Sequence, residues 1–238
     1  MKIAGLQKNS FVDYPGKIAA VVFTLGCNMD CYYCHNRGLL SCEQSQTELL
    51  DEIDVIDFLA ERRKFLDGVV ISGGEPTMQE GLGEFIQKIR DMGYSIKLDT
   101  NGTNPNVLER LFSDSLIDYV AMDIKAPFER YSELCRSDVN IENIQRSIEL
   151  IMGEGLEYEF RTTFVPKLSY KDIEKMVKSI KGAKHYVLQQ YRTPELASDD
   201  GLEIDSPYSS DYIYETADRI CKGVVGFEVR GCVHGIGW

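Results

Sequence analysis

The chain has 238 residues, of which 43% are hydrophobic and 27% charged, a composition typical of a globular domain with a sizeable core. Its formal net charge of −12 argues against a nucleic-acid surface and against docking on anionic lipid, because both need clustered basic side chains. Residues 1–8 lack a run of signal-peptide type, and the best apolar run, 18–25, is too short to cross a bilayer, so we expect a cytoplasmic protein.

Segments with strand character alternate with helical segments from about residue 18 onward. The run from Ile18 to Leu25 is apolar and rich in β-branched residues, as expected of a parallel strand buried on both faces. Similar runs predict further strands over 69–72, 96–98, 117–122, 157–165, 185–191 and 224–229.

Helix signals lie between these strands. A capping-box pattern at Ser45 and Glu48 precedes a helix whose expected apolar positions are Leu49, Ile53, Ile56 and Leu59. The same pattern at Ser169 and Asp172 predicts a capped helix, and Asn104 before Pro105 predicts another. The remaining helices are expected near 82–92, from 141 to 153 or 155, and over 211–222.

The alternation predicts parallel strands joined by right-handed crossovers. The strand–helix units number six, fewer than in a complete (β/α)8 barrel. Periodicity leaves two forms open, a partial barrel and an open doubly wound sheet. We expect one domain over 1–238, with a core at about 18–192 and a helix–strand tail over 193–238.

Three of the 7 cysteines, Cys27, Cys31 and Cys34, are separated by three residues and then by two. In a chain without an export signal, such a group indicates metal binding rather than a disulfide framework. Three thiolates on one loop can bind three irons of a [4Fe-4S] cluster and leave one iron open for chemistry. A zinc site with His35 as the fourth ligand is the alternative.

Polar and glycine-rich segments follow the ends of the predicted strands. Parallel α/β folds gather their chemistry at the carboxyl ends of their strands, so we expect these segments to meet above the cysteine loop. They are 72–76, 99–102, 123–125, 161–166 and 189–190.

Together these motifs resemble the radical S-adenosylmethionine (SAM) enzymes. The resemblance rests on Cys-x3-Cys-x2-Cys, with Tyr33 before the third cysteine, and on Gly-Gly-Glu-Pro at 73–76, and it spans roughly residues 10–192. Asp13-Tyr14-Pro15-Gly16 and Cys34-His35-Asn36 are similar to the activases of glycyl radical enzymes, and most of all to those of anaerobic ribonucleoside-triphosphate reductase.

The resemblance implies a partial (β/α)6 TIM-like barrel and an enzyme that cleaves SAM reductively at a [4Fe-4S] cluster. Such an activase removes a hydrogen atom from a glycine of a glycyl radical enzyme, here anaerobic ribonucleoside-triphosphate reductase. Flavodoxin or ferredoxin would supply the electron, and growth would be anaerobic. The alternatives are a radical SAM enzyme of cofactor or modified-base synthesis, which acts on a small molecule, and a non-enzymatic iron–sulfur electron carrier.

The same resemblance assigns site residues. It implies the three cysteines as cluster ligands, with no further catalytic side chain, and Asp13 as a contact to the partner's glycine loop, although a plain turn also explains that residue. A monovalent cation is implied beside Asp99, Thr100 and Asp123. The residues implied to contact SAM are Tyr33, Gly73, Gly74, Glu75, Pro76, Asp99, Thr100, Asn101, Asp123, Lys125, Arg161 and Gln190.

Four cysteines remain outside the loop. Cys221 and Cys232 could in principle share an auxiliary site, but buried free thiols are commoner than auxiliary clusters. We therefore expect free thiols at Cys42, Cys135, Cys221 and Cys232.

Overall fold

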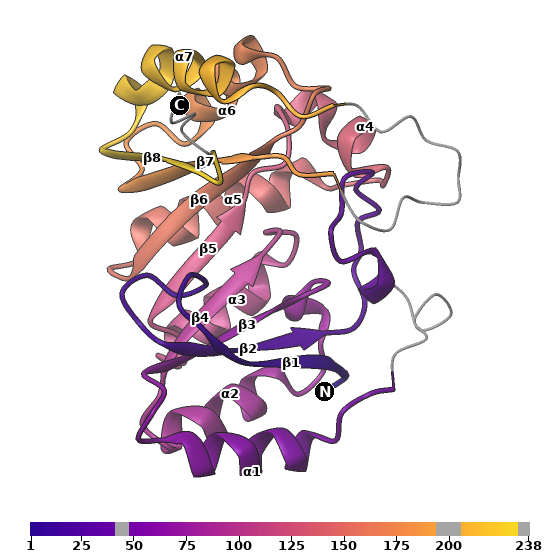
Figure 1. Ribbon diagram of the computed structural model, residues 1–238, viewed down its shortest axis with the longest axis vertical. Helices are drawn as coiled ribbons and strands as arrows, with labels where there is room; N and C mark the ends of the chain where they lie inside the picture. Colours follow the sequence, from indigo (N-terminus) through magenta and orange to yellow (C-terminus); the bar gives the residue numbers. More distant parts are fainter. Residues whose placement is uncertain (41–47, 194–205, 233–238) are drawn as a thin grey trace, which may run out of the picture. The chain divides into compact units, whose positions relative to one another are not determined.

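The computed structural model describes residues 1–40, 48–193 and 206–232. Strand order along its mostly parallel sheet follows the chain, from β1 to β8, which confirms the expected α/β class (Figure 1). No helix among the described residues is long and apolar enough to cross a membrane. The chain divides into a first unit (Met1–Met29, Asn36–Ala121 and Glu142–Glu157) and a second unit (Asp30–His35, Met122–Ile141 and Tyr158–Trp238).

The first unit contains four strands and the start of a fifth. The strands are β1 (Ile3–Ser10), β2 (Ala19–Thr24), β3 (Gly68–Gly73), β4 (Ser95–Thr100) and, in part, β5 (Tyr119–Asp123). β2, β3 and β4 run parallel, as predicted, and they pair in chain order. The helices are α1 (Glu52–Arg62), α2 (Leu82–Asp91), α3 (Pro105–Ser113) and α5 (Ile141–Gly153).

Strand β1 was not predicted. It pairs antiparallel with β2, with Ile3 opposite Thr24 and Ser10 opposite Ala19. Only Ile3, Ala4 and Ser10 of this strand are buried, and its polar stretch 7–9 breaks the alternation that marks a strand in sequence. The turn between β1 and β2 therefore lies at the amino end of β2, whereas the cysteine loop follows its carboxyl end.

The prediction of the first helix is partly wrong. Ser45 lies outside the described residues, and α1 begins at Glu52 after Asp51, whose Oδ1 accepts a hydrogen bond of 2.9 Å from Ile53 N. Val55 and Leu59 face the core, whereas Ile53, in the first turn, is 66% exposed, so the buried face of the helix differs from the expected one.

The cap of α3 also differs from the prediction. Pro105 begins the helix as expected, but the Asn104 side chain makes no capping bond. Instead, Asn104 Nδ2 donates to Thr77 Oγ1 at 2.9 Å. A tertiary hydrogen bond has therefore replaced the local one.

The second unit holds the end of β5 and three further parallel strands, β6 (Glu157–Phe164), β7 (His185–Gln190) and β8 (Gly226–Arg230). Its helices are α4 (Tyr131–Cys135), α6 (Tyr170–Ser179) and α7 (Ser210–Ile220). The predicted capping box of Ser169 and Asp172 is confirmed at the start of α6. Buried Phe160, Phe164 and Tyr186 form part of this unit's core.

Candidate functional site

The Gly-Gly-Glu segment at the end of β3 packs directly against the start of the cysteine loop. Gly73 has φ +120°, and a β-carbon there would lie 2.2 Å from Thr24 N. A β-carbon on Gly74 would lie 2.1 Å from the oxygen of Gly26, which accepts a hydrogen bond of 2.8 Å from Glu75 N. Glycine is required at both positions because the chain's own backbone approaches so closely.

Residues after the cysteine loop form hydrogen bonds with the start of that loop and with the end of β3. Gly26 N donates to Leu39 O at 2.7 Å, and Cys27 N donates to Leu40 O at 3.2 Å. Asn36 Nδ2 donates to Gly73 O at 3.2 Å. Within the first unit, both flanks of the cysteine loop are thus fixed to the end of β3 and to each other.

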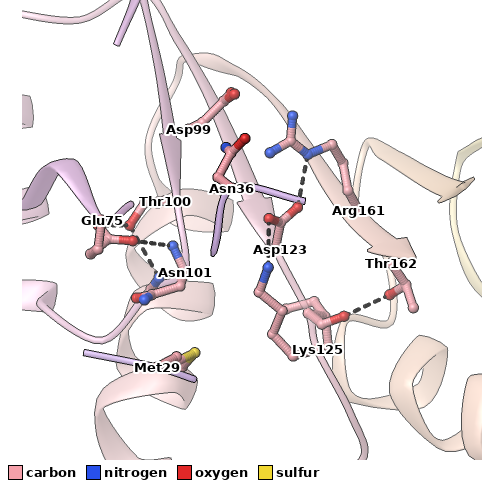
Figure 2. Close-up of polar contacts among 12 residues, drawn as sticks. Met29, Asn36, Glu75, Asp99, Thr100, Asn101, Asp123, Lys125, Arg161 and Thr162 are labelled. Atoms are coloured by element: carbon pink, nitrogen blue, oxygen red, sulfur yellow. Dashed lines mark hydrogen bonds and ion pairs between the residues drawn. The ribbon is translucent and has the colours of Figure 1, made fainter. Parts of the chain in front are cut away.

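Glu75 links the ends of β3 and β4 from a fully buried position. Its Oε1 accepts from Thr100 Oγ1 at 2.8 Å, and its Oε2 accepts from Asn101 N at 2.7 Å (Figure 2). Thr77 N, in the short turn that begins at Pro76, also donates to Oε1 at 3.1 Å. Burial raises the pKa of Glu75, while these hydrogen bonds oppose that rise. The carboxyl group therefore holds the backbone around Asn101.

Three side chains form a closed ring of hydrogen bonds beside Cys27. Thr103 Oγ1 donates to Asn101 Oδ1 (2.7 Å), Asn101 Nδ2 donates to Asn28 Oδ1 (2.9 Å), and Asn28 Nδ2 donates to Thr103 Oγ1 (2.9 Å). Asn101 Nδ2 also lies 3.9 Å from Cys27 Sγ, and Met29 N donates to the same sulfur at 3.4 Å. No role for Asn28 or Thr103 was expected from the sequence.

Asp99 is paired inside the first unit with a residue that sequence analysis missed. Lys97 Nζ lies 2.6 Å from Asp99 Oδ1, and Ser72 Oγ donates to Oδ2 at 3.1 Å. Lys97 is almost completely buried, although it stands between Ile96 and Leu98 in an apolar strand. A lysine in such a strand was the signal that could have revealed this pair.

In the second unit, the expected residues Asp123, Lys125 and Arg161 do come together. Asp123 Oδ1 accepts from Arg161 Nε and Asp123 Oδ2 accepts from Lys125 Nζ, both at 2.9 Å (Figure 2). Burial alone would raise the pKa of Asp123, but the two cationic side chains outweigh it and hold that pKa well below its ordinary value. Asp123 is therefore ionised and its charge is balanced by protein groups.

Cys31 and Tyr33, also in the second unit, are buried. A hydrogen bond from Cys135, helped by the charge of Lys125, lowers the pKa of Cys31 to about 7 despite burial. Asp30 N donates to Cys135 O at 2.9 Å, which ties this segment to the end of α4. Burial raises the pKa of Tyr33, so its hydroxyl stays neutral.

Gln190 and Asp13, the two remaining expected site residues, make hydrogen bonds of their own. Gln190 Nε2, at the end of β7, donates to Tyr208 O at 3.2 Å. Asp13 lies in the β1–β2 turn, where its carboxylate accepts from Ser10 Oγ. Because β2 separates this turn from Cys27, the structure does not bring Asp13 to the carboxyl ends of the first unit's strands.

The donor chemistry of the loop fits an iron–sulfur cluster. Cys27, Cys31 and Cys34 form no disulfide, Cys27 has two nearby N–H donors, and the lowered pKa of Cys31 eases its deprotonation. Among the described residues, no three His, Cys, Asp or Glu side chains converge on a point that could hold one metal ion. The ligands of a cluster bind separate irons and need no such common point. Cys42 lies outside the described residues.

Comparison with known proteins gives relatives over most of the chain. The model of the Radical SAM superfamily matches residues 21–180. A protein of Methanocaldococcus jannaschii named "Putative glycyl-radical enzyme activating enzyme" is 40% identical over 212 residues, which cover 86% of each chain. A "Probable GTP 3',8-cyclase" of Saccharolobus solfataricus is 23% identical over 257 residues, covering 90% of this chain and 82% of the cyclase.

A solved structure with the same fold is SuiB of Streptococcus suis, determined bound to S-adenosylmethionine. The two structures superpose with a TM-score of 0.64 at 15% sequence identity. The match covers 87% of this chain and 49% of SuiB, so this chain corresponds to about half of that protein. At this identity the likeness is one of fold.

Proposed function

The chain belongs to the radical SAM superfamily and is a radical SAM enzyme, and from that premise we propose that it is the activase of a glycyl radical enzyme. The observation that carries the proposal is the 40% identity to the M. jannaschii protein over 86% of both chains. A second M. jannaschii protein with the same descriptive name is 28% identical over 162 residues. The motifs at 13–16 and 34–36 support the same assignment.

The family implies a [4Fe-4S] cluster and SAM as cofactors. We propose that Cys27, Cys31 and Cys34 bind three irons and leave the fourth for SAM. When bound, the cluster and SAM supply the one-electron chemistry that cleaves SAM and removes the hydrogen atom. The protein binds and orients them, which explains why Glu75 and the backbone around Gly74 are fixed by buried contacts.

The contacts to SAM are part of this proposal. The ion-paired trio Asp123, Lys125 and Arg161 offers both charges needed to recognise an amino-acid group. Tyr33 is assigned to the adenine and the segment 73–76 to the methionine amino group. The remaining proposed contacts are Asp99, Thr100, Asn101 and Gln190.

We propose a protein partner for the chemistry. Anaerobic ribonucleoside-triphosphate reductase is the proposed client, flavodoxin or ferredoxin the electron donor, and the anaerobic cytoplasm the setting, with 1–238 acting as a single catalytic domain. Asp13 remains the proposed contact to the client. Its support is the exposed turn on which it lies, where Phe11 is 71% and Val12 is 81% exposed.

The second candidate is a radical SAM enzyme with a small-molecule substrate. The observation that favours it is the similarity to a named GTP 3',8-cyclase over 90% of this chain. The identity to that protein is 23%, against 40% for the named activating enzyme, so the activase is the better supported function.

Electron paramagnetic resonance tests the proposal. The reconstituted, reduced protein is mixed without air with SAM and the host's anaerobic ribonucleotide reductase, and a glycyl-radical doublet is expected. The Cys31→Ala variant, which lacks one proposed cluster ligand, should give none. Formation of 5′-deoxyadenosine without a doublet would overturn this client, and a doublet with another glycyl radical enzyme would retain the activase function.

A further inference from the structure

The sulfur of Cys27 has a side-chain donor beside it. Asn101 Nδ2 lies 3.9 Å from Cys27 Sγ, in addition to the backbone N–H of Met29 at 3.4 Å. Only 5% of Asn101 is exposed. A buried amide so close to a cysteine is held there by its other contacts, and those contacts decide which end of the amide faces the sulfur.

The hydrogen-bond ring fixes that orientation. Asn101 Oδ1 accepts both from Thr103 Oγ1 at 2.7 Å and from Thr103 N at 3.0 Å, and a backbone N–H can only donate. The oxygen therefore faces Thr103, and Nδ2 must face Asn28 and Cys27. Each of the three side chains in the ring donates to the next, an arrangement that strengthens every bond in it.

The backbone of Asn101 is fixed independently. Its N–H donates at 2.7 Å to Oε2 of the fully buried Glu75. A side chain held by the ring and a backbone held by Glu75 leave the amide no freedom to turn from the sulfur. A group that hydrogen-bonds to a metal ligand must be held in place in this way if it is to tune the properties of the metal site.

We propose that Asn101 is a positioning residue that donates an N–H···S hydrogen bond to the Cys27 thiolate and thereby raises the reduction potential of the cluster. Hydrogen bonds to ligand sulfurs stabilise the extra negative charge of the reduced cluster. The inference rests on the proposed function only in taking Cys27 as a cluster ligand, and it holds for any client. By resemblance Asn101 was assigned only as a SAM contact, and the inference gives it a second contact, to Cys27.

The test is a redox titration followed by electron paramagnetic resonance in the absence of SAM. Asn101→Asp keeps the shape of the side chain, removes both N–H donors and places a carboxylate near the sulfur. Its midpoint potential should be more negative than that of the wild type at equal iron and sulfide content. Asn106→Asp makes the same exchange at an exposed position that accepts from Arg146, and it should leave the potential unchanged.

Thr103→Val keeps the inference testable if Asn101→Asp does not retain its cluster. It removes one donor to Asn101 Oδ1 and the acceptor for Asn28, without altering Asn101 or Cys27. A smaller shift in the same direction is expected. An unchanged potential in a cluster-loaded Asn101→Asp protein, or in Thr103→Val when that is the only loaded variant, would overturn the proposal.

Two other measurements distinguish this inference from a direct contact of Asn101 with SAM and from the proposed activase function. A weaker affinity for SAM with an unchanged potential would return Asn101 to a plain SAM contact and overturn the proposal. The glycyl-radical assay does not enter this test, because the potential is measured without SAM or client. A shifted potential in a protein that forms no glycyl radical would therefore support this inference while contradicting the activase function.

Discussion

Lys97 Nζ lies 2.6 Å from Asp99 Oδ1, and only 1% of Lys97 is exposed. A buried ammonium group is stable only with a partner, so the two charges depend on each other. Asp123, in the second unit, is paired in the same way with Arg161 and Lys125. The chain thus supplies positive charge to both carboxylates beside which sequence analysis expected a monovalent cation.

Binding of SAM should therefore be independent of sodium and potassium in the wild type. In Lys97→Met the Asp99 carboxylate loses its partner, so affinity for SAM should fall at least tenfold in potassium-free buffer and recover partly when potassium is added. Calorimetry on the cluster-loaded protein without reductant gives both affinities. The control is Lys88→Met, which removes a surface partner of Glu52. A wild-type requirement for potassium would contradict the prediction.

Gly74→Ala should destabilise the protein even without a cluster. The added β-carbon would lie 2.1 Å from Gly26 O, and neither backbone segment can move without breaking the bond between Glu75 N and that oxygen. Overpacking of this kind costs about 3 kcal/mol of unfolding free energy. Urea denaturation measures the loss. Gly153→Ala, at the end of α5 with no atom within 4 Å, should lose nothing.

Cys31→Ala should abolish the cluster while leaving the fold intact. The thiol of Cys31 is one of three proposed ligands, and two cysteines cannot hold the cube. Iron and sulfide analysis with the visible absorption spectrum measures the loss, and zinc analysis of the wild type separates the alternative metal. The control is Cys221→Ala, at the half-buried residue that directly follows α7, and it should retain four irons per chain if the assignment of ligands is correct.

Tyr14 should make stability fall in alkaline solution. Burial, with the charge of Asp118, raises the pKa of Tyr14 from its ordinary value of 10.0 to about 12. Between these values the unfolded chain loses a proton that the folded chain keeps, so stability decreases as pH rises, by up to about 1.4 kcal/mol per pH unit. Below this interval Tyr14 has no such effect. The free energy of unfolding, measured by denaturation at several pH values, should fall less steeply with pH in Tyr14→Phe than in the wild type. Equal slopes for the two proteins would contradict the prediction.

Much of the parallel part of the fold was readable from sequence because each strand carries its own apolar run. β3 and β4 were expected within a few residues of their bounds, and α6 begins at the predicted capping box. β1 was missed because its burial comes from pairing with β2, and its own polar residues hide it. The buried face of α1 was only partly predicted because Ile53, an apolar residue in the first turn, faces solvent.

In the candidate site, too, features carried by a local motif were predicted, whereas those that depend on tertiary contacts were not. The motifs, through their resemblance to a known family, indicated candidate contacts to the cofactors, and the structure shows which hydrogen bonds and ion pairs hold several of those residues. Glu75 is a proposed SAM contact, and the hydrogen bonds that its oxygens accept from the end of β4 could not be read from the motif. Asn28, Lys97, Thr103 and Cys135 were missed because their partners lie far away in sequence or depend on how side chains pack.

The contact between Gly26 and Gly74 bears on attempts to transplant the cysteine loop. The backbone of the loop's first residues packs directly on the backbone of residues 73–75. It occupies the space that side chains at Gly73 and Gly74 would need. A graft that carries only 26–36 into another scaffold would meet side chains on the neighbouring strand. The smallest unit that could be transferred therefore consists of two segments, 26–36 with its three cysteines and 73–75, which contains no cysteine.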